Sequence, residues 1–158
     1  MSKLLQIILT GTLLFSFLLA DSLGASQGNN PGKTPDVSLK NTAGESAPLG
    51  SYIGSKPLLL VFWASWCAEC RSEVPLLSKL DKERFKVIAV NEGESAWKTK
   101  RFVSTNSVTY QVALDADGSI AKAFQVPGVP GCIIIDKSGQ IVYRGTGVPE
   151  NMADYAAK

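Results

Sequence analysis

The sequence predicts an α/β fold in which a mixed central sheet carries helices on both faces. A continuous apolar run over 57–63 has the length of a strand that is buried on both sides. From Cys67 onward, apolar residues recur every three or four positions, which is the period of a helix. A third apolar run, 132–135, is followed by a turn and a return over 141–143, as in a β-hairpin. Strands that alternate with helices in this order build layered α/β domains.

The start of the domain is predicted to be an N-terminal β-hairpin extension. Val37 and Leu39 alternate with polar neighbours, which favours a short strand. Residues 42–45 are turn-like, and 47–49 then form the returning strand.

The other elements follow from the same patterns. Residues 85–90 are predicted to be a second buried strand, and 95–105 a helix with Ser95 as its N-cap. One or two helical turns are expected over 120–124, and a last short helix over 149–158. Pro75 lies within the helix that follows Cys67 and should kink it.

The first residues are interpreted as a targeting element. Residues 4–20 are almost entirely apolar and follow one cation, Lys3. Residues 1–25 are therefore either a cleaved signal peptide or an uncleaved membrane anchor, 26–34 a flexible linker, and 35–158 the folded domain. Either alternative places the domain outside the cytoplasm, in a periplasm or at the outer face of the cytoplasmic membrane, secreted or N-terminally anchored.

Composition narrows the possible chemistry. The chain has 158 residues, a net charge of +2, three cysteines and no histidine. So small a charge gives no reason to expect nucleic acid as a partner. Without histidine and with so few cysteines, a closed tetrahedral zinc site is not expected.

Two cysteines carry the predicted chemistry. Trp66-Cys67-Ala68-Glu69-Cys70 lies where a buried strand gives way to a helix. Unpaired N–H groups at a helix start favour an anion, so the Cys67 thiolate should be stabilised. Cys70, one turn later, can close a disulfide with Cys67 and resolve a mixed disulfide with a partner.

Two alternatives to a redox pair remain. A zinc knuckle would need a second pair of ligands, and haem attachment would need histidine where Arg71 stands. The position between strand and helix therefore favours the redox interpretation.

The chain resembles the TlpA/ResA-like family of extracytoplasmic, membrane-associated thioredoxins. The resemblance covers nearly all of 35–147 and includes the Phe-Trp-Ala-Ser-Trp-Cys run of 62–67, Asn91-Glu92-Gly93-Glu94-Ser95 and Val129-Pro130. It implies a thioredoxin fold in which Pro130 is cis and faces the dithiol. The Val129 backbone would then pair with a substrate chain. The family commonly has Thr after the proline, so Gly131 should alter the grip on the substrate.

The resemblance also directs attention to acidic residues. Thioredoxins carry a buried acid where this chain has Val61. Glu73 matches an acid of the TlpA/ResA-like group; it shares a helix face with Cys70, and burial should raise its pKa so that it takes the Cys70 proton. The alternative is a surface carboxylate paired with Lys or Arg. Glu92 and Glu94 are weaker candidates for the same role.

Glu69 should disfavour the Cys67 thiolate, or else be a solvated residue with little effect. In the first case the potential lies nearer about −270 mV than about −120 mV. Cys132 is expected to be an inert core residue; the alternative is that it lies under the dithiol and traps a non-native disulfide. Trp63 and Trp66 are expected mainly to pack, with Trp66 forming a wall of the site.

These residues predict a thiol:disulfide oxidoreductase that acts as a reductase of protein disulfides and needs no cofactor beyond the Cys67–Cys70 disulfide. The resemblance implies a membrane electron donor of the DsbD/CcdA kind and apocytochrome c among the substrates, as in cytochrome c maturation. The chain is expected to be a monomer. A thiol oxidase or isomerase, and a thioredoxin-fold binding or chaperone module, are the alternatives.

Overall fold

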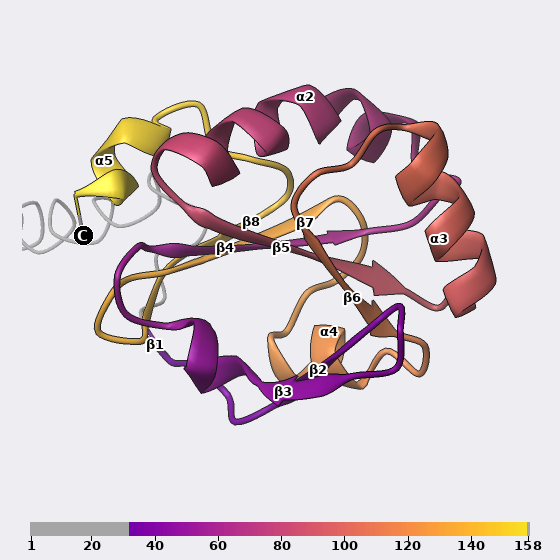
Figure 1. Ribbon diagram of the computed structural model, residues 1–158. Helices are drawn as coiled ribbons and strands as arrows, with labels where there is room; N and C mark the ends of the chain where they lie inside the picture. The colour runs from indigo at the N-terminus through magenta and orange to yellow at the C-terminus, as the bar shows by residue number, and fades with distance from the viewer. Residues whose placement is uncertain (1–31, 158) are drawn as a thin grey trace, which may run out of the picture.

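The computed structural model describes residues 32–157, which form one mixed sheet with helices on both faces (Figure 1). The strands, in chain order, are β1 (Gly32–Lys33), β2 (Ser38–Asn41), β3 (Ser46–Pro48), β4 (Leu58–Trp63), β5 (Lys86–Glu92), β6 (Gln111–Asp115), β7 (Gly131–Ile135) and β8 (Gln140–Gly145). The helices are the 3₁₀-helix η1 (Leu49–Tyr52) and the α-helices α2 (Ala68–Glu83), α3 (Ala96–Thr105), α4 (Ser119–Ala123) and α5 (Met152–Ala156).

Strand β4 lies at the centre of the sheet. The spatial order is β1-β8-β7-β4-β5-β6-β2-β3. β4 runs parallel to β5 and antiparallel to β7, and β5 runs parallel to β6. The predicted α/β class with a mixed sheet is therefore confirmed. All six residues of β4 are buried, as its apolar run predicted.

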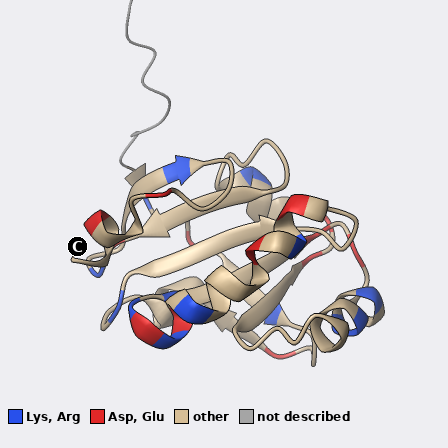
Figure 2. Cartoon of the chain, turned by 90° about the horizontal axis from the view of Figure 1, so that it is seen from above, with Lys and Arg blue, Asp and Glu red and all other residues tan. Residues whose placement is uncertain are grey.

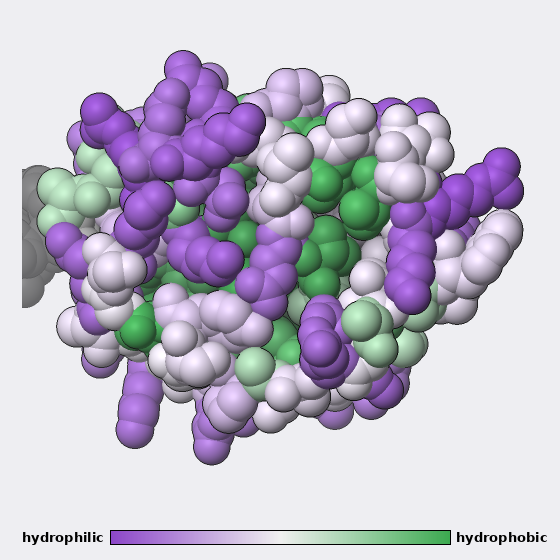
Figure 3. Space-filling model, in the orientation of Figure 1, coloured by the Kyte–Doolittle hydropathy of each residue, from purple (hydrophilic) through white to green (hydrophobic). Residues whose placement is uncertain are grey.

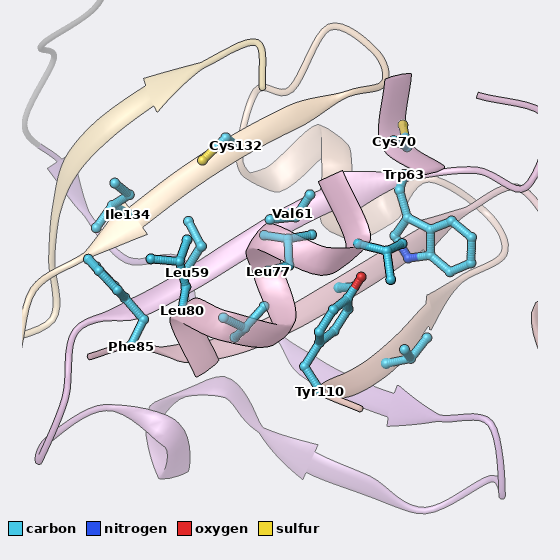
Figure 4. Close-up of a cluster of buried hydrophobic side chains, with 14 of the residues drawn as sticks. Leu59, Val61, Trp63, Cys70, Leu77, Leu80, Phe85, Tyr110, Cys132 and Ile134 are labelled. Atoms are coloured by element: carbon cyan, nitrogen blue, oxygen red, sulfur yellow. The ribbon is translucent and has the colours of Figure 1, made fainter. Parts of the chain in front are cut away.

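The two faces of β4 pack into separate cores. Leu59, Val61 and Trp63 face α2, α3 and α5 in one cluster, part of which Figure 4 shows. Leu58, Leu60 and Phe62 face α4 and the N-terminal hairpin in the other. This alternation is the two-residue period of a strand. In Figure 3 hydrophobic residues are visible toward the middle of this face, with hydrophilic residues among them and around them.

Lys and Arg alternate with Asp and Glu along α2 and are spread over the other elements (Figure 2). Among the described residues, no helix has the length and apolar character needed to span a membrane. The predicted targeting element, 1–25, and most of the predicted linker lie outside the described residues.

Three details differ from the sequence predictions. β6 was not predicted, because its apolar core of Val112, Ala113 and Leu114 is too short to show a period. α5 covers only Met152–Ala156 of the expected 149–158. Gly32 and Lys33, expected in the linker 26–34, pair with Ile141 and Gln140 of β8, so the ordered domain begins before residue 35.

The predicted N-terminal hairpin is present as β2 and β3. Leu39 pairs with Ala47, and Lys40 of the same strand continues the main sheet by pairing with Leu114 of β6. The expected N-cap of α3 is also present, since the Ser95 hydroxyl accepts the Lys98 N–H at 3.4 Å.

Candidate active site

Both cysteines lie where β4 ends and α2 begins. Cys67 is the N-cap of α2, and its sulfur accepts the Cys70 N–H at 3.1 Å. The two form a disulfide with their Cα atoms 5.3 Å apart. Cys67 is 6% and Cys70 4% exposed, so little of either sulfur is open to solvent. The predicted pairing and its position at a helix start are therefore confirmed.

The two tryptophans beside the motif have different environments. Trp63 is buried and packs on Phe102, with ring centroids 4.5 Å apart, as expected of a core residue. Trp66 is 70% exposed, so the expectation that it mainly packs is wrong. The strand alternation ends at Ala64, and the turn that follows carries the Trp66 ring outward next to Cys67.

The predicted cis proline is present next to β7. The Val129–Pro130 bond is cis, and Gly131 pairs with Phe62 near the end of β4, which brings the loop to the dithiol end of the sheet. A Cβ on Gly131 would clash with Val126 Cγ1 and lie 3.0 Å from the Gly128 carbonyl oxygen. The loop therefore folds closely over residue 131, and the threonine common in the family would not fit without a shift.

A groove of about 590 Å³ separates the start of α2 from the cis-proline loop. It lies beside the motif, because one of its wall residues, Glu69, stands between the two cysteines in the sequence. Its walls come from α2, the loop before β7 and the end of β8. They are formed by Glu69, Ser72, Glu73, Pro127, Gly128, Val129, Pro130, Thr146 and Gly147.

Glu73 lies at the inner wall of this groove. Its Oε1 accepts the Val148 N–H at 3.1 Å, whereas Oε2 is buried without a hydrogen-bond partner. Burial raises the pKa of Glu73, the bond from Val148 lowers it in part, and the Glu69 carboxylate raises it further. The predicted rise is confirmed, and no ion pair with Lys or Arg holds this carboxylate within the described residues.

The two weaker acidic candidates diverge. Burial raises the pKa of Glu92, and the neighbouring Asp115 raises it further. For Glu94, burial alone would raise the pKa, but hydrogen bonds from Asn91, Lys98 and Ser65 outweigh it and lower the pKa to about 2. Glu94 therefore stays ionised and cannot store a proton near neutral pH, so it is a wrong candidate for that role.

Cys132 lies in the core as expected. It is fully buried, forms no disulfide, and pairs with Val61 of β4 and Gly145 of β8. Burial raises the pKa of its thiol, and the charge of Glu73 raises it further. These observations favour the inert-core interpretation. Cys132 nevertheless belongs to the same buried cluster as Cys70 (Figure 4).

Val61 is buried in the same cluster, so the position of the thioredoxin acid is apolar here. Two acids, Glu69 and Glu73, line the groove, and Glu73 is the one whose pKa is raised by burial. Within residues 32–157 no group of three or more His, Cys, Asp or Glu side chains is arranged to hold a metal ion.

Sequence reasoning missed the residues that support the motif from behind. Ser65, Asn91 and Thr99 form a hydrogen-bonded network with Glu94. One signal was available: Asn91 lies near the end of the buried strand β5 and Glu94 follows that strand, and neighbouring parallel strands end at the same edge of a sheet. That edge also carries the dithiol.

Comparison with known proteins agrees with this geometry. The AhpC/TSA family model matches residues 32–144. Thioredoxin-like protein YneN of Bacillus subtilis (strain 168) is 33% identical over 151 residues, covering 90% of this chain and 86% of YneN. Thiol-disulfide oxidoreductase ResA of the same organism is 28% identical over 148 residues, covering 91% and 80%.

A solved relative has the same fold. The crystal structure of a thiol:disulfide interchange protein from Chlorobium tepidum TLS superposes with a TM-score of 0.67 at 26% identity, covering 80% of this chain and 92% of that one. With the helix-capping disulfide and the cis-proline groove in place, the chain belongs to the AhpC/TSA family, as one of its thioredoxin-like thiol-disulfide oxidoreductases.

Proposed function

We propose that the chain acts outside the cytoplasm as a reductase of protein disulfides, with Cys67 as the attacking sulfur. The observation that carries the proposal is the dithiol at the start of α2, next to a groove that contains an acid of raised pKa. An extended chain in that groove would lie against Val129 and Pro130, with its cysteine near Cys67.

The exchange proceeds in two balanced steps. The Cys67 thiolate attacks one sulfur of the partner's disulfide, forms a mixed disulfide and releases the other sulfur as a thiolate. Cys70 then loses its proton to Glu73 and attacks Cys67, which releases the second partner sulfur as a thiolate. Two electrons pass to the partner, whose two thiolates take up two protons. The chain is left with the newly formed Cys67–Cys70 disulfide.

Charge supports the reducing direction. The Glu69 carboxylate follows Cys67 by two residues on the first turn of α2. Its negative charge disfavours the Cys67 thiolate and so offsets the stabilisation that the helix dipole gives to that thiolate. A less stabilised thiolate makes the disulfide harder to reduce, so the dithiol is a better electron donor.

Location and partners rest on the sequence and on the named relatives. The apolar segment 4–20 directs the domain out of the cytoplasm. Because such compartments are oxidising, continued reduction needs electrons from a membrane donor of the DsbD/CcdA kind. Apocytochrome c, whose cysteines must be reduced before haem attachment, is the proposed substrate. The relative ResA is named a thiol-disulfide oxidoreductase, which supports a protein thiol or disulfide as the target.

The reduction potential tests the direction. We expect equilibration of the protein with a dithiothreitol or glutathione couple to give a value near about −270 mV. A value near about −120 mV would instead assign the chain to the oxidases.

A trapped intermediate tests the attacking sulfur and identifies the substrate. A Cys70→Ser variant lacks the resolving thiol, so it should accumulate mixed disulfides through Cys67 with envelope proteins. Cys67→Ser, which keeps Cys70, is the matched control and should trap far less. A Cys67→Ser variant that kept full cellular function would favour the binding-module alternative and contradict the proposal.

A further inference from the structure

A buried polar network lies behind the dithiol, on the side away from the groove. The Glu94 carboxylate accepts the Ser65 N–H and the Ser65 hydroxyl, each at 2.7 Å. It also accepts the Asn91 side-chain amide at 2.8 Å and pairs with Lys98 at 2.6 Å. The Glu94 side chain is only 4% exposed. Two polar groups of the turn after β4 are therefore tied to the segment that links β5 to α3.

The orientation of the Glu94 carboxylate is fixed by two buried residues, Asn91 of β5 and Thr99 of α3. Asn91 and Thr99 are fully buried. The Thr99 hydroxyl contacts the Asn91 side-chain oxygen at 2.9 Å and the Ser95 carbonyl oxygen at 3.1 Å. Because the Asn91 oxygen is engaged by Thr99, its NH₂ group faces Glu94. Breaking one member leaves buried polar groups unpaired, so the network holds as a unit.

Ser65 is held on its other side as well. Its carbonyl oxygen accepts an Arg71 guanidinium N–H at 3.3 Å, and the preceding Ala64 carbonyl accepts the Cys67 N–H at 3.1 Å. The turn from Ala64 to Cys67 is thus anchored from Glu94 and from the first turn of α2. This turn determines where the Cys67 sulfur lies relative to the start of α2.

We propose that Glu94 is a positioning residue for the redox reaction: through Ser65 it fixes the turn that holds the Cys67 sulfur against the N–H groups at the start of α2. Glu94 does not contact the partner or exchange a proton in this role. The inference rests on the proposed attack by Cys67, but it does not depend on the direction in which electrons flow.

Charge and position make opposite predictions, which makes the role testable. If Glu94 acted only as a nearby negative charge, its removal would lower the pKa of the Cys67 thiol. If it acts through the turn, its removal loosens the sulfur from the helix start and raises that pKa.

The experiment compares Glu94→Ala with Glu94→Gln in the reduced, full-length protein. Both variants remove the charge and leave Lys98 unpaired, but the Gln carbonyl can still accept the Ser65 N–H. The readout is the rate of iodoacetamide alkylation of Cys67 against pH, with the peptide assigned by mass spectrometry. Below the pKa of Cys67 we expect the Ala variant to react about threefold more slowly than the Gln variant.

Asp136→Asn is the matched control. Asp136 also accepts loop N–H groups, from Ser138 and Gln140, but it lies in the β7–β8 turn at the other end of the sheet. We expect it to change unfolding and to leave Cys67 alkylation unchanged. Equal rates for the Ala and Gln variants, faster alkylation in both, or the same slowing in Asp136→Asn would each overturn the proposal.

Further measurements keep the outcomes separable. If Glu94→Ala does not fold, Glu94→Met replaces it, because its side chain is close in size to that of Gln but has no carbonyl to accept the Ser65 N–H. Alkylation slower than in Glu94→Gln would support the proposal, and equal rates would overturn it. Failure of Cys67 to form mixed disulfides in the unaltered chain would instead contradict the proposed function. An oxidising potential in the unaltered chain, with the Ala–Gln difference intact, would reverse the direction and leave this inference standing.

Discussion

The dithiol has a carboxylate on each side, and the two have opposite environments. On the groove side, Glu73 has one hydrogen bond, from Val148, and one buried oxygen without a partner. On the other side, both oxygens of Glu94 are engaged, by Ser65, Asn91 and Lys98. Both are removed from water, yet the pKa rises for Glu73 and falls to about 2 for Glu94.

The difference shows that burial alone does not decide what a carboxylate does. Desolvation is the largest influence on both and acts in the same direction. The number of donors decides the outcome, because each N–H or O–H that points at the ionised form favours it. Glu73 is left able to exchange a proton, whereas Glu94 is left as a fixed structural charge.

Replacing the acid of the groove should have the largest effect. Glu73→Gln keeps the size of the side chain but cannot accept the Cys70 proton, so we expect disulfide reduction to slow about a hundredfold near neutral pH. The rate should also lose the part of its pH dependence that follows Glu73. Stopped-flow reduction of a model disulfide across pH measures both.

The same variant also tests how the free energy of unfolding depends on pH. A raised pKa means that folding favours the protonated acid, so this contribution is present below about pH 4.5 and is lost as pH rises through the pKa of the folded state. Relative to Glu73→Gln, the unaltered chain should therefore lose stability as pH rises. Glu83→Gln, an exposed change at the end of α2, is the control and should alter neither the rate nor this trend.

The shape of the groove side can be tested at Gly131. Gly131→Thr restores the residue common in the family but places a Cβ against Val126 and the Gly128 carbonyl. We expect urea unfolding to show a loss of about 2 kcal/mol. Gly128→Ala is the matched control, since a Cβ there meets nothing within 4 Å. Equal stability of the two variants would contradict the close packing of this loop.

The contribution of Glu94 to stability should be lost in acid. The lowered pKa of Glu94 means that its contribution is present above about pH 4.5 and is lost as pH falls toward about 2. Chemical unfolding at pH 5, 4 and 3 should therefore show that the free energy of unfolding falls with pH, and that it falls less steeply in Glu94→Gln than in the unaltered chain. Parallel declines in the two proteins would show that the network does not stabilise the folded state through this charge.

The smallest effect is expected at Glu69, which belongs to the cysteine motif and also lines the groove. The charge of Glu69 raises the pKa of Glu73, so Glu69→Gln should lower that pKa. The midpoint of the pH–rate profile would shift to lower pH. The same change should make the dithiol a weaker reductant, because the Cys67 thiolate loses an opposing charge. An unchanged midpoint together with an unchanged potential would identify Glu69 as a solvated residue.

The sequence alone determined the centre of the fold and the redox pair. The apolar run of β4, the helical period after Cys67 and the hairpin of β7 and β8 are local patterns that reflect burial. The position of Cys67 at a strand–helix junction is equally local. The cis state of Pro130 came from the family resemblance, since the residues by themselves favoured an ordinary loop proline.

Only the tertiary structure decided the surroundings of the acids and the shape of the groove. Nothing in the letters of Asn91-Glu92-Gly93-Glu94 shows that Glu94 meets Ser65, which lies 29 positions away. The exposure of Trp66 and the contact of Val148 with Glu73 likewise depend on turns that distant strands bring together. The reason is physical: the pKa of a carboxylate follows the donors and the solvent around it, and these are set by segments far away in the chain.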